Sequence, residues 1–189
     1  RFIDPYRARE IARRLPPFVT PVGVFVNQPA AHINAVASLV GLAVLQLHGD
    51  ETPEHLAGLR RPVLKALGLT SADAVAGGAS TVQDVAAVWP DRVTLLVDAH
   101  DPVRRGGTGR TVDWSVAAAL AARRRVVLAG GLTPENVADA VRRVRPFGID
   151  VSSGVERSPG VKDEARMKAL FQSVGEAMST APHEGARIL

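Results

Sequence analysis

Short apolar runs alternate with amphipathic stretches along most of the chain. Six runs are rich in β-branched residues and lack polar–apolar alternation, which is typical of strands buried on both faces. They cover residues 22–26, 44–48, 63–67, 93–98, 126–129 and 149–153. The strands recur every 20–30 residues or so, about the length of one strand–helix unit. This order predicts a parallel sheet covered by helices.

The stretches between the runs place apolar residues on one helical face. Such faces predict helices around Ala8, Ile11, Ala12 and Leu15; Ile33, Val36, Ala37 and Val40; Val82, Val85 and Ala86; Trp114, Ala117, Ala118 and Ala121; Val137, Val141 and Val144; and Met167, Leu170, Phe171, Val174 and Met178. An oxygen-bearing residue precedes proline at Asp4-Pro5, Thr52-Pro53 and Thr133-Pro134. Because proline lacks the N–H that would have no partner in the first turn, we expect helices to begin at these three positions.

Two architectures fit alternating strands and helices, an open doubly wound sheet and a closed (β/α)8 TIM barrel. Residues 106–111, Gly-Gly-Thr-Gly-Arg-Thr, match neither the dinucleotide nor the Walker A spacing. Polar residues or glycines follow almost every strand, and in a barrel these positions line the mouth that holds the active site. The pattern therefore favours a barrel, with residues 1–189 as a single domain.

A barrel has eight strands, and six are identifiable here. The chain opens with a predicted helix rather than a strand. We therefore expect a strand–helix–strand segment of roughly 35–45 residues to precede Arg1, so that the domain is incomplete at its N-terminus. The sequence leaves open whether the tail at residues 179–189 is ordered or disordered.

Composition narrows the classes of protein. A chain that is 46% hydrophobic with a net charge of +4 is not a disordered one. It contains no cysteine, so these residues hold neither a disulfide framework nor a thiol nucleophile. The longest apolar-leaning run, residues 35–47, is shorter than the ~20 residues that a membrane helix needs. Without a signal peptide either, the sequence predicts a cytoplasmic protein with no membrane partner.

The pI of about 10.3 raises the question of nucleic-acid binding. Aromatic residues make up only 4% of the chain and offer no platform on which bases could stack. Solvated helix faces explain the arginine clusters more simply, so we expect no nucleic-acid partner. A positive field can still attract an anionic small molecule.

Glycine and serine follow the last two predicted strands, at Gly130-Gly131 and at Ser152-Ser153-Gly154. Phosphate-binding barrels grip the anion there with backbone N–H groups, and glycine allows the backbone a close approach. We therefore interpret Gly130, Gly131, Ser153 and Gly154 as a phosphate site. Ordinary strand-to-helix turns remain the alternative.

Asp98 is the candidate general acid. It ends a strand that should be buried, where a carboxyl group is costly unless it has a partner, and a general acid needs such surroundings. A helix N-cap or a structural ion pair would explain Asp98 equally well. Asp150 is a weaker candidate because it falls inside its predicted strand.

Three further residues are candidates for binding a ligand. Gln46 is a plausible pocket amide, and His48 follows it at the same strand end. A lone histidine in that position is more often a structural hydrogen-bonding group than a catalyst. Arg1 could hold a carboxylate with two hydrogen bonds, or it could be a frayed terminal residue.

Several of these segments resemble the phosphoribosylanthranilate isomerases of tryptophan biosynthesis. The similarity runs in order from Arg1 to about Phe171, through residues 22–28, 46–51, 95–98, 106–109, 113–114, 128–136, 150–156 and 158–163. The resemblance implies an Amadori rearrangement of N-(5-phosphoribosyl)anthranilate to 1-(2-carboxyphenylamino)-1-deoxyribulose 5-phosphate. It implies no metal and no organic cofactor.

The resemblance also implies roles for particular residues. Asp98 matches the general acid of the family, and Arg1 matches the arginine that binds the anthranilate carboxylate. Gly130, Gly131, Ser153 and Gly154 fall in the phosphate loops, and Gln46 and His48 are assigned to substrate binding. The general base of the family is a cysteine in a Lys-Ile-Cys-Gly-like motif, which this sequence lacks.

The missing base would lie in the segment expected before Arg1, so we expect residues 1–189 alone to have poor activity. The leading hypothesis is an isomerase that acts on a phosphorylated small molecule, as a monomer or a homodimer. The alternatives are a non-catalytic phosphate-binding barrel or another sugar-phosphate barrel enzyme.

Overall fold

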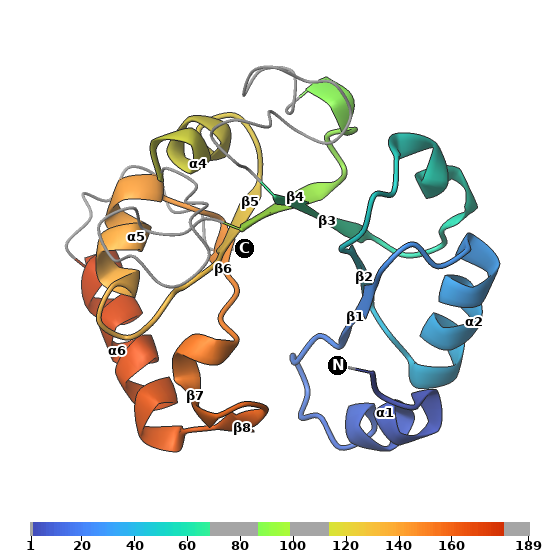
Figure 1. The fold of residues 1–189 in the computed structure, drawn as a ribbon, viewed down its shortest axis with the longest axis horizontal. Helices are drawn as coiled ribbons and strands as arrows, with labels where there is room; N and C mark the ends of the chain where they lie inside the picture. The colour runs from blue at the N-terminus through green and yellow to red at the C-terminus, as the bar shows by residue number, and fades with distance from the viewer. Residues whose placement is uncertain (1, 69–86, 99–113, 180–189) are drawn as a thin grey trace. The chain divides into compact units, whose positions relative to one another are not determined.

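The fold comes from a computed structural model that describes residues 2–68, 87–98 and 114–179 (Figure 1). All six predicted strands are present in these ranges: β1 (Val22–Phe25), β2 (Val44–Leu47), β3 (Val63–Gly68), β4 (Thr94–Asp98), β5 (Val126–Ala129) and β6 (Gly148–Ile149). The last strand is shorter than predicted: it ends at Ile149, and a 3-10 turn, η2 (Ser153–Val155), follows.

Five α-helices lie wholly within the described ranges: α1 (Pro5–Ala12), α2 (Ala30–Val40), α4 (Trp114–Ala121), α5 (Val137–Val144) and α6 (Glu164–Ser179). Residues 87–88 are helical as well. The five helices match five of the six predicted apolar faces. The sixth, at Val82, Val85 and Ala86, falls outside the described residues, as do residues 180–189 of the predicted tail.

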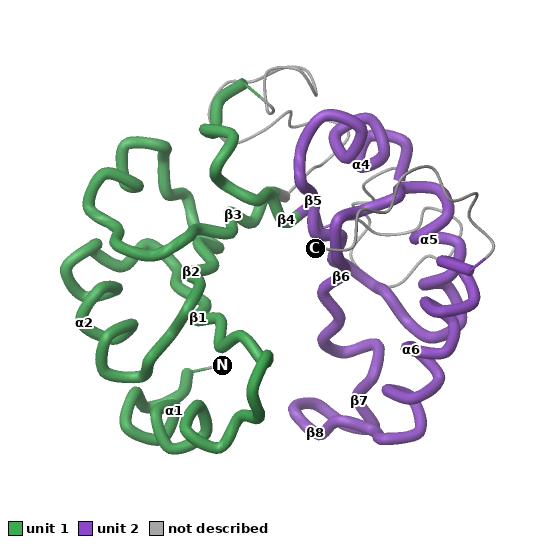
Figure 2. Tube along the Cα trace, turned by 180° about the vertical axis from the view of Figure 1, so that it is seen from behind, with its two compact units in different colours: residues 1–68, 74–96 green, residues 69–73, 97–189 purple. Residues whose placement is uncertain are grey.

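The chain divides into two compact units, which Figure 2 shows in different colours. Unit 1 comprises residues 1–68 and 74–96, and unit 2 comprises residues 69–73 and 97–189. In unit 1, β1 pairs in parallel with β2 and β2 pairs in parallel with β3. In unit 2, β5 pairs in parallel with β6, with Leu128 opposite Ile149. The predicted parallel pairing is therefore confirmed within each unit.

Of the three proline signals, only Asp4-Pro5 begins an α-helix. The Asp4 carboxylate accepts hydrogen bonds from the N–H groups of Tyr6 at 2.9 Å and Arg7 at 3.3 Å, and thereby caps α1. Thr52 precedes a 3-10 helix, η1 (Pro53–Gly58), and makes no side-chain cap. Pro134 lies in a turn before α5, whose first residue is Val137. The predicted helix start is therefore confirmed at Pro53, although the helix is a 3-10 helix. It was wrong at Pro134, because proline fits a turn as well as a first helical position.

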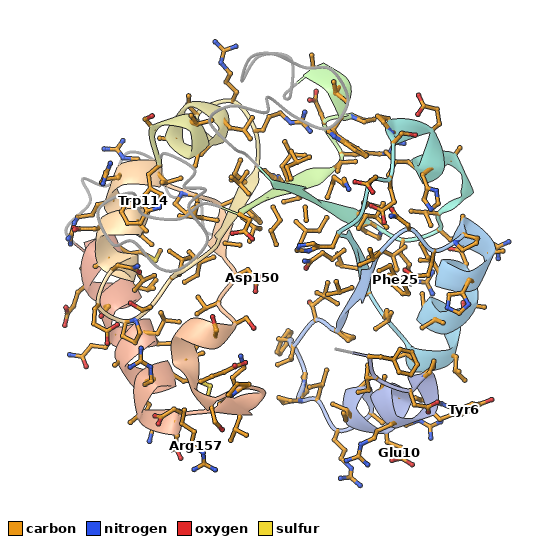
Figure 3. The ribbon with its side chains drawn as sticks, viewed as in Figure 1. Tyr6, Glu10, Phe25, Trp114, Asp150 and Arg157 are labelled. Atoms are coloured by element: carbon orange, nitrogen blue, oxygen red, sulfur yellow. The ribbon has the colours of Figure 1, made fainter. Side chains whose placement is uncertain are left out.

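In unit 1, α2 packs on the strands with Ile33, Ala37 and Val40 buried. Figure 3 shows Phe25 of β1 beside α2, and its side chain is buried as well. Alternate residues of a strand face opposite sides. Val22 and Val24 are exposed, so the prediction that this strand is buried on both faces was wrong. The predicted apolar face of α1 also buries no residue.

In unit 2, α4, α5 and α6 succeed one another beside β5 and β6 (Figure 1). Val137 of α5, Val155 after β6 and Leu170 of α6 form a buried apolar cluster. Trp114 of α4 is buried, and the guanidinium of Arg143 lies 4.8 Å from its ring centre. The predicted stripe of α6 is only partly buried, since Phe171 and Met178 at its edge are exposed.

A hairpin that the apolar pattern did not predict follows η2. It joins β7 (Glu156–Ser158) to β8 (Val161–Lys162) in antiparallel pairing. Asp163 then caps α6, because its carboxylate accepts the N–H of Arg166 at 2.9 Å. Within the ranges that the structure describes, none of the helices combines the length and the apolar character that a bilayer crossing requires.

Candidate functional site

The loop after β5 adopts a conformation that favours glycine. Gly130 has a φ of +90° and Gly131 a φ of +60°, values that L-residues with side chains seldom adopt. Gly131 is exposed, whereas Leu132 after it is buried and anchors the loop in the core. The strand end at Gly130 and Gly131 is therefore a turn with exposed backbone at Gly131, and the phosphate site predicted there stays a prediction.

Asn136 holds this loop in shape. Its side chain is 7% exposed, its Oδ1 accepts the N–H of Thr133 at 2.8 Å and its Nδ2 donates to the carbonyl of Gly131 at 3.0 Å. A buried side-chain amide whose oxygen and nitrogen are both hydrogen-bonded to the backbone fixes the backbone around it. Sequence reasoning missed this role, although Asn136 stands in the segment 128–136 that carries part of the resemblance.

The loop after β6 lies directly against the loop after β5. A Cβ atom added to Gly154 would be 2.9 Å from the carbonyl carbon of Leu132 and 3.3 Å from the Cα of Thr133. Only glycine permits this approach. Ser153, the residue before it, is exposed. The four residues predicted to bind phosphate therefore lie on two loops in contact, within one unit.

Asp98 ends β4 and belongs to the same unit as these loops. The three residues before it, Leu95 to Val97, are buried, but Asp98 itself is exposed, so the expectation of a buried carboxyl group was wrong. The reason is positional, since the last residue of a strand reaches the rim where the covering elements end. An exposed carboxyl group is accessible to a ligand. Asp150 is also exposed and lies on the side of β6 away from α5 and α6 (Figure 3).

In unit 1, Gln46 and His48 lie together at the carboxyl end of β2. Gln46 is 8% exposed, and its Nε2 is 3.0 Å from Nδ1 of the exposed His48. Because an amide nitrogen can only donate, Nδ1 accepts in this arrangement. The side chain of Gln46 therefore orients the ring of His48.

Unit 1 also contains a buried ion pair that sequence reasoning missed. Nζ of Lys65 on β3 lies 2.8 Å from Oε2 of Glu51, and the two side chains are 4% and 1% exposed. The same Nζ donates to the carbonyl of Gly49 and lies 5.8 Å from the ring centre of Trp89. The signal that could have found the pair is a lysine inside an otherwise apolar strand, which needs a counter-charge.

Burial raises the pKa of Glu51, but hydrogen bonds from Lys65 and from backbone N–H groups outweigh it and hold the pKa below the ordinary value. Those backbone donors are Asn27, at 2.8 Å, and Glu51 itself. The N–H of Gly49 also donates to the carboxylate, at 2.9 Å. Asn27 has a φ of +59°, and its Oδ1 accepts the N–H of Asp50 at 2.7 Å. Glu51 and Asn27 therefore tie the ends of β1 and β2 together.

Arg1 and residues 106–111 lie outside the described residues, so the carboxylate clamp implied for Arg1 stays a prediction. In the described part of the chain, the histidines and carboxylates include no cluster of three or more that could hold a metal ion.

Comparison with known proteins gives one consistent result. The sequence matches the family of N-(5'phosphoribosyl)anthranilate (PRA) isomerase over residues 1–173. It is 44% identical over 183 residues to an N-(5'-phosphoribosyl)anthranilate isomerase of Pelobacter propionicus, covering 95% of this chain and 81% of that protein.

Comparison with solved structures finds the same family of isomerases. The phosphoribosyl anthranilate isomerase of Thermotoga maritima superposes with a TM-score of 0.75 at 40% identity, covering 93% of this chain and 82% of that one. A complex of such an isomerase with reduced 1-(o-carboxyphenylamino)-1-deoxyribulose 5-phosphate superposes with a TM-score of 0.74 at 38% identity, covering 93% and 81%. These neighbours are TIM barrels, so the predicted (β/α)8 fold class is confirmed.

Proposed function

The chain belongs to the PRA isomerase family of tryptophan biosynthesis, and from this premise we propose that it takes part in the Amadori rearrangement of N-(5-phosphoribosyl)anthranilate. The observation that best supports this is the contact between the two glycine-bearing loops of unit 2. Gly131 and Ser153 of these loops are exposed residues. A related isomerase binds a reduced form of the phosphorylated product.

The phosphate group of the substrate binds at these two loops. Backbone N–H groups are suitable donors for a phosphate, and the net charge of +4 adds a favourable field. Since this binding is mainly through the backbone, inorganic phosphate should compete with the substrate. Gln46 and His48 remain substrate-binding residues on the resemblance alone.

Asp98 donates the first proton. Protonation of the furanose ring oxygen breaks its bond to C1′ and gives an open-chain Schiff base. Loss of the C2′ proton then yields an enolamine, which tautomerises to the ketone. The proton transfer from Asp98 requires a carboxyl group accessible to substrate, and its exposure at the end of β4 meets that condition. Residues 1–189 contain no cysteine, so we assign no residue of this chain to removal of the C2′ proton.

The absence of a cysteine from residues 1–189 favours a second candidate function, a non-catalytic phosphate-binding barrel. It would keep the loops after β5 and β6 and would have no use for an acid at Asp98. The two functions differ in what replacement of Asp98 does.

The test is Asp98→Asn in the full-length protein, measured by steady-state conversion of N-(5-phosphoribosyl)anthranilate. We expect kcat to fall by about 10²–10⁴ with KM changed little, because the acid acts on the transition state. Asp150→Asn, at another exposed strand end, is the matched control and should retain kcat. Near-normal turnover by Asp98→Asn would remove Asp98 from the acid role. A protein that binds phosphate but converts no substrate would support the non-catalytic alternative.

A further inference from the structure

We propose that Lys162 and Arg166 are positioning residues that hold the loop at residues 152–154 from behind, so that its N–H groups point toward the phosphate. The inference rests on the proposed function, because it concerns how the same anion site is kept in shape. Lys162 lies in the segment 158–163 that carries part of the resemblance, but no role was assigned to it or to Arg166 from the sequence.

Lys162 holds the first carbonyl of the loop. Its Nζ donates to the carbonyl of Ser152 at 2.7 Å and to Oε1 of Glu156 at 3.1 Å. Glu156 and Lys162 are directly opposite each other in the β7–β8 hairpin. The other carboxylate oxygen of Glu156 accepts the N–H of Gly160 at 3.1 Å, in the hairpin turn. The side chain of Glu156 is 5% exposed, so the ammonium group is directed by a buried partner.

Arg166 holds the last carbonyl of the loop. Its Nε donates to the carbonyl of Gly154 at 3.0 Å. Its guanidinium also lies 3.6 Å from Oε2 of Glu135. The backbone N–H of Arg166 donates to the carboxylate of Asp163, which caps α6. Asp163 in turn donates its N–H to the carbonyl of Val155 at 2.8 Å. The start of α6 is thus tied to the carbonyls of Gly154 and Val155.

The middle carbonyl is bonded too, since Ser153 accepts the N–H of Glu156. Three consecutive carbonyls are therefore held by partners that follow the loop in the chain. In a planar trans peptide the C=O and the next N–H point in opposite directions. The N–H groups of Ser153 and Gly154 consequently point away from Lys162 and from the N–H of Glu156, and the N–H of Val155 points away from Arg166. Successive N–H groups turned to one side form an anion-binding concavity.

Lys162 and Arg166 therefore have a role that differs from attracting the phosphate by their positive charge. Each donates to a carbonyl, on the side of the peptide opposite to the N–H groups. If they acted only through their charge, then removal of the negative charge of Glu156 would strengthen phosphate binding. If they act by position, then the same change weakens binding, because Lys162 loses the carboxylate that directs it.

The test measures the affinity of the full-length protein for inorganic phosphate by isothermal titration calorimetry, with circular dichroism as a check of folding. We expect Lys162→Met and Arg166→Met each to weaken binding by about tenfold, and Glu156→Gln to weaken it by three- to tenfold. Lys168→Met is the matched control. Lys168 is also on α6 but is 76% exposed and paired with Glu164, and its loss should change affinity by no more than about twofold.

Tighter or unchanged binding by Glu156→Gln would overturn the positioning role, even if either cation variant failed to fold. An effect of Lys168→Met equal to that of Lys162→Met would also overturn it, in favour of a general field. If the wild type binds phosphate and both cation variants bind as well as it does, then the positioning role is wrong while the anion site stands. If the wild type binds none, then both proposals fall.

Discussion

Gly154 has no room for a side chain. Its Cα faces the backbone of Leu132 and Thr133 rather than the flexible end of a side chain, so its neighbours cannot move aside cheaply. From the sequence, Gly154 was interpreted as part of a phosphate-binding loop because it follows a predicted strand. The physical reason for a glycine here turns out to be contact between two loops, which a local sequence pattern does not specify.

Gly154→Ala should lower the free energy of unfolding by about 1–3 kcal/mol, as overpacking does, and should weaken phosphate binding. Chemical denaturation gives the first quantity. Gly175→Ala is the control, because a Cβ at Gly175 in α6 meets no atom within 4 Å. It should be neutral or stabilise by up to about 1 kcal/mol. Equal stabilities of the two variants would contradict the close packing of the loops.

Glu51 is expected to make unit 1 sensitive to acid. Its pKa is lower in the folded chain than its ordinary value of 4.5, so the unfolded chain binds more protons in the interval between the two values. Stability contributed by Glu51 is therefore present above about pH 4.5 and is lost as pH falls through the folded pKa. Glu51→Gln should lower stability at pH 7 by about 3–5 kcal/mol, because it leaves buried Lys65 without its counter-charge.

Denaturation curves between pH 3 and pH 7 test this expectation. The stability of Glu51→Gln should change less with pH in the acid range than that of the wild type. Glu54→Gln is the control, since hydrogen bonds to the Thr52 side chain and the backbone also lower the pKa of Glu54, but this side chain is exposed. If the acid response is the same in the wild type and in Glu51→Gln, then the buried pair does not govern it.

At the scale of elements, apolar runs rich in β-branched residues predicted the six strands β1 to β6, and apolar helical faces predicted the helices α1, α2, α4, α5 and α6. The signal works because a strand buried on both faces is apolar along its length, whereas a packed helix is apolar on one face. It failed for β7 and β8, which are short and mostly exposed, so that burial leaves no pattern in them. The start of an α-helix was predicted correctly at Asp4, where the side chain caps the first turn, and the start of a 3-10 helix at Pro53.

Asp4→Ala should therefore destabilise the first turn of α1 by about 1 kcal/mol, the usual contribution of an N-cap. Hydrogen exchange of the Tyr6 and Arg7 amides, which donate to Asp4, is the measurement, and both should exchange faster. Thr52→Ala serves as the control, because Thr52 makes no cap bond to η1. Unchanged exchange in Asp4→Ala would show that Pro5 alone sets the helix start.

At the scale of the whole molecule, the resemblance found in the sequence is confirmed by the family match and by the structural neighbours. The loops around Gly131 and Ser153 were identified as a pair from sequence, and their contact is seen in the structure. The cations behind them were not identified. Lys162 and Arg166 act on backbone carbonyls, and a backbone contact imposes no recognisable spacing on the sequence.

The most direct test of the phosphate site is a titration of the isotopically labelled protein with inorganic phosphate, followed by amide proton–nitrogen correlation spectra. The amides of Gly131, Ser153 and Gly154 should shift most and should saturate together, and adding N-(5-phosphoribosyl)anthranilate should displace the phosphate. If the largest saturable shifts instead fall around Gln46 and His48, or if no amide of the loops after β5 and β6 responds, then the anion is not bound where we place it.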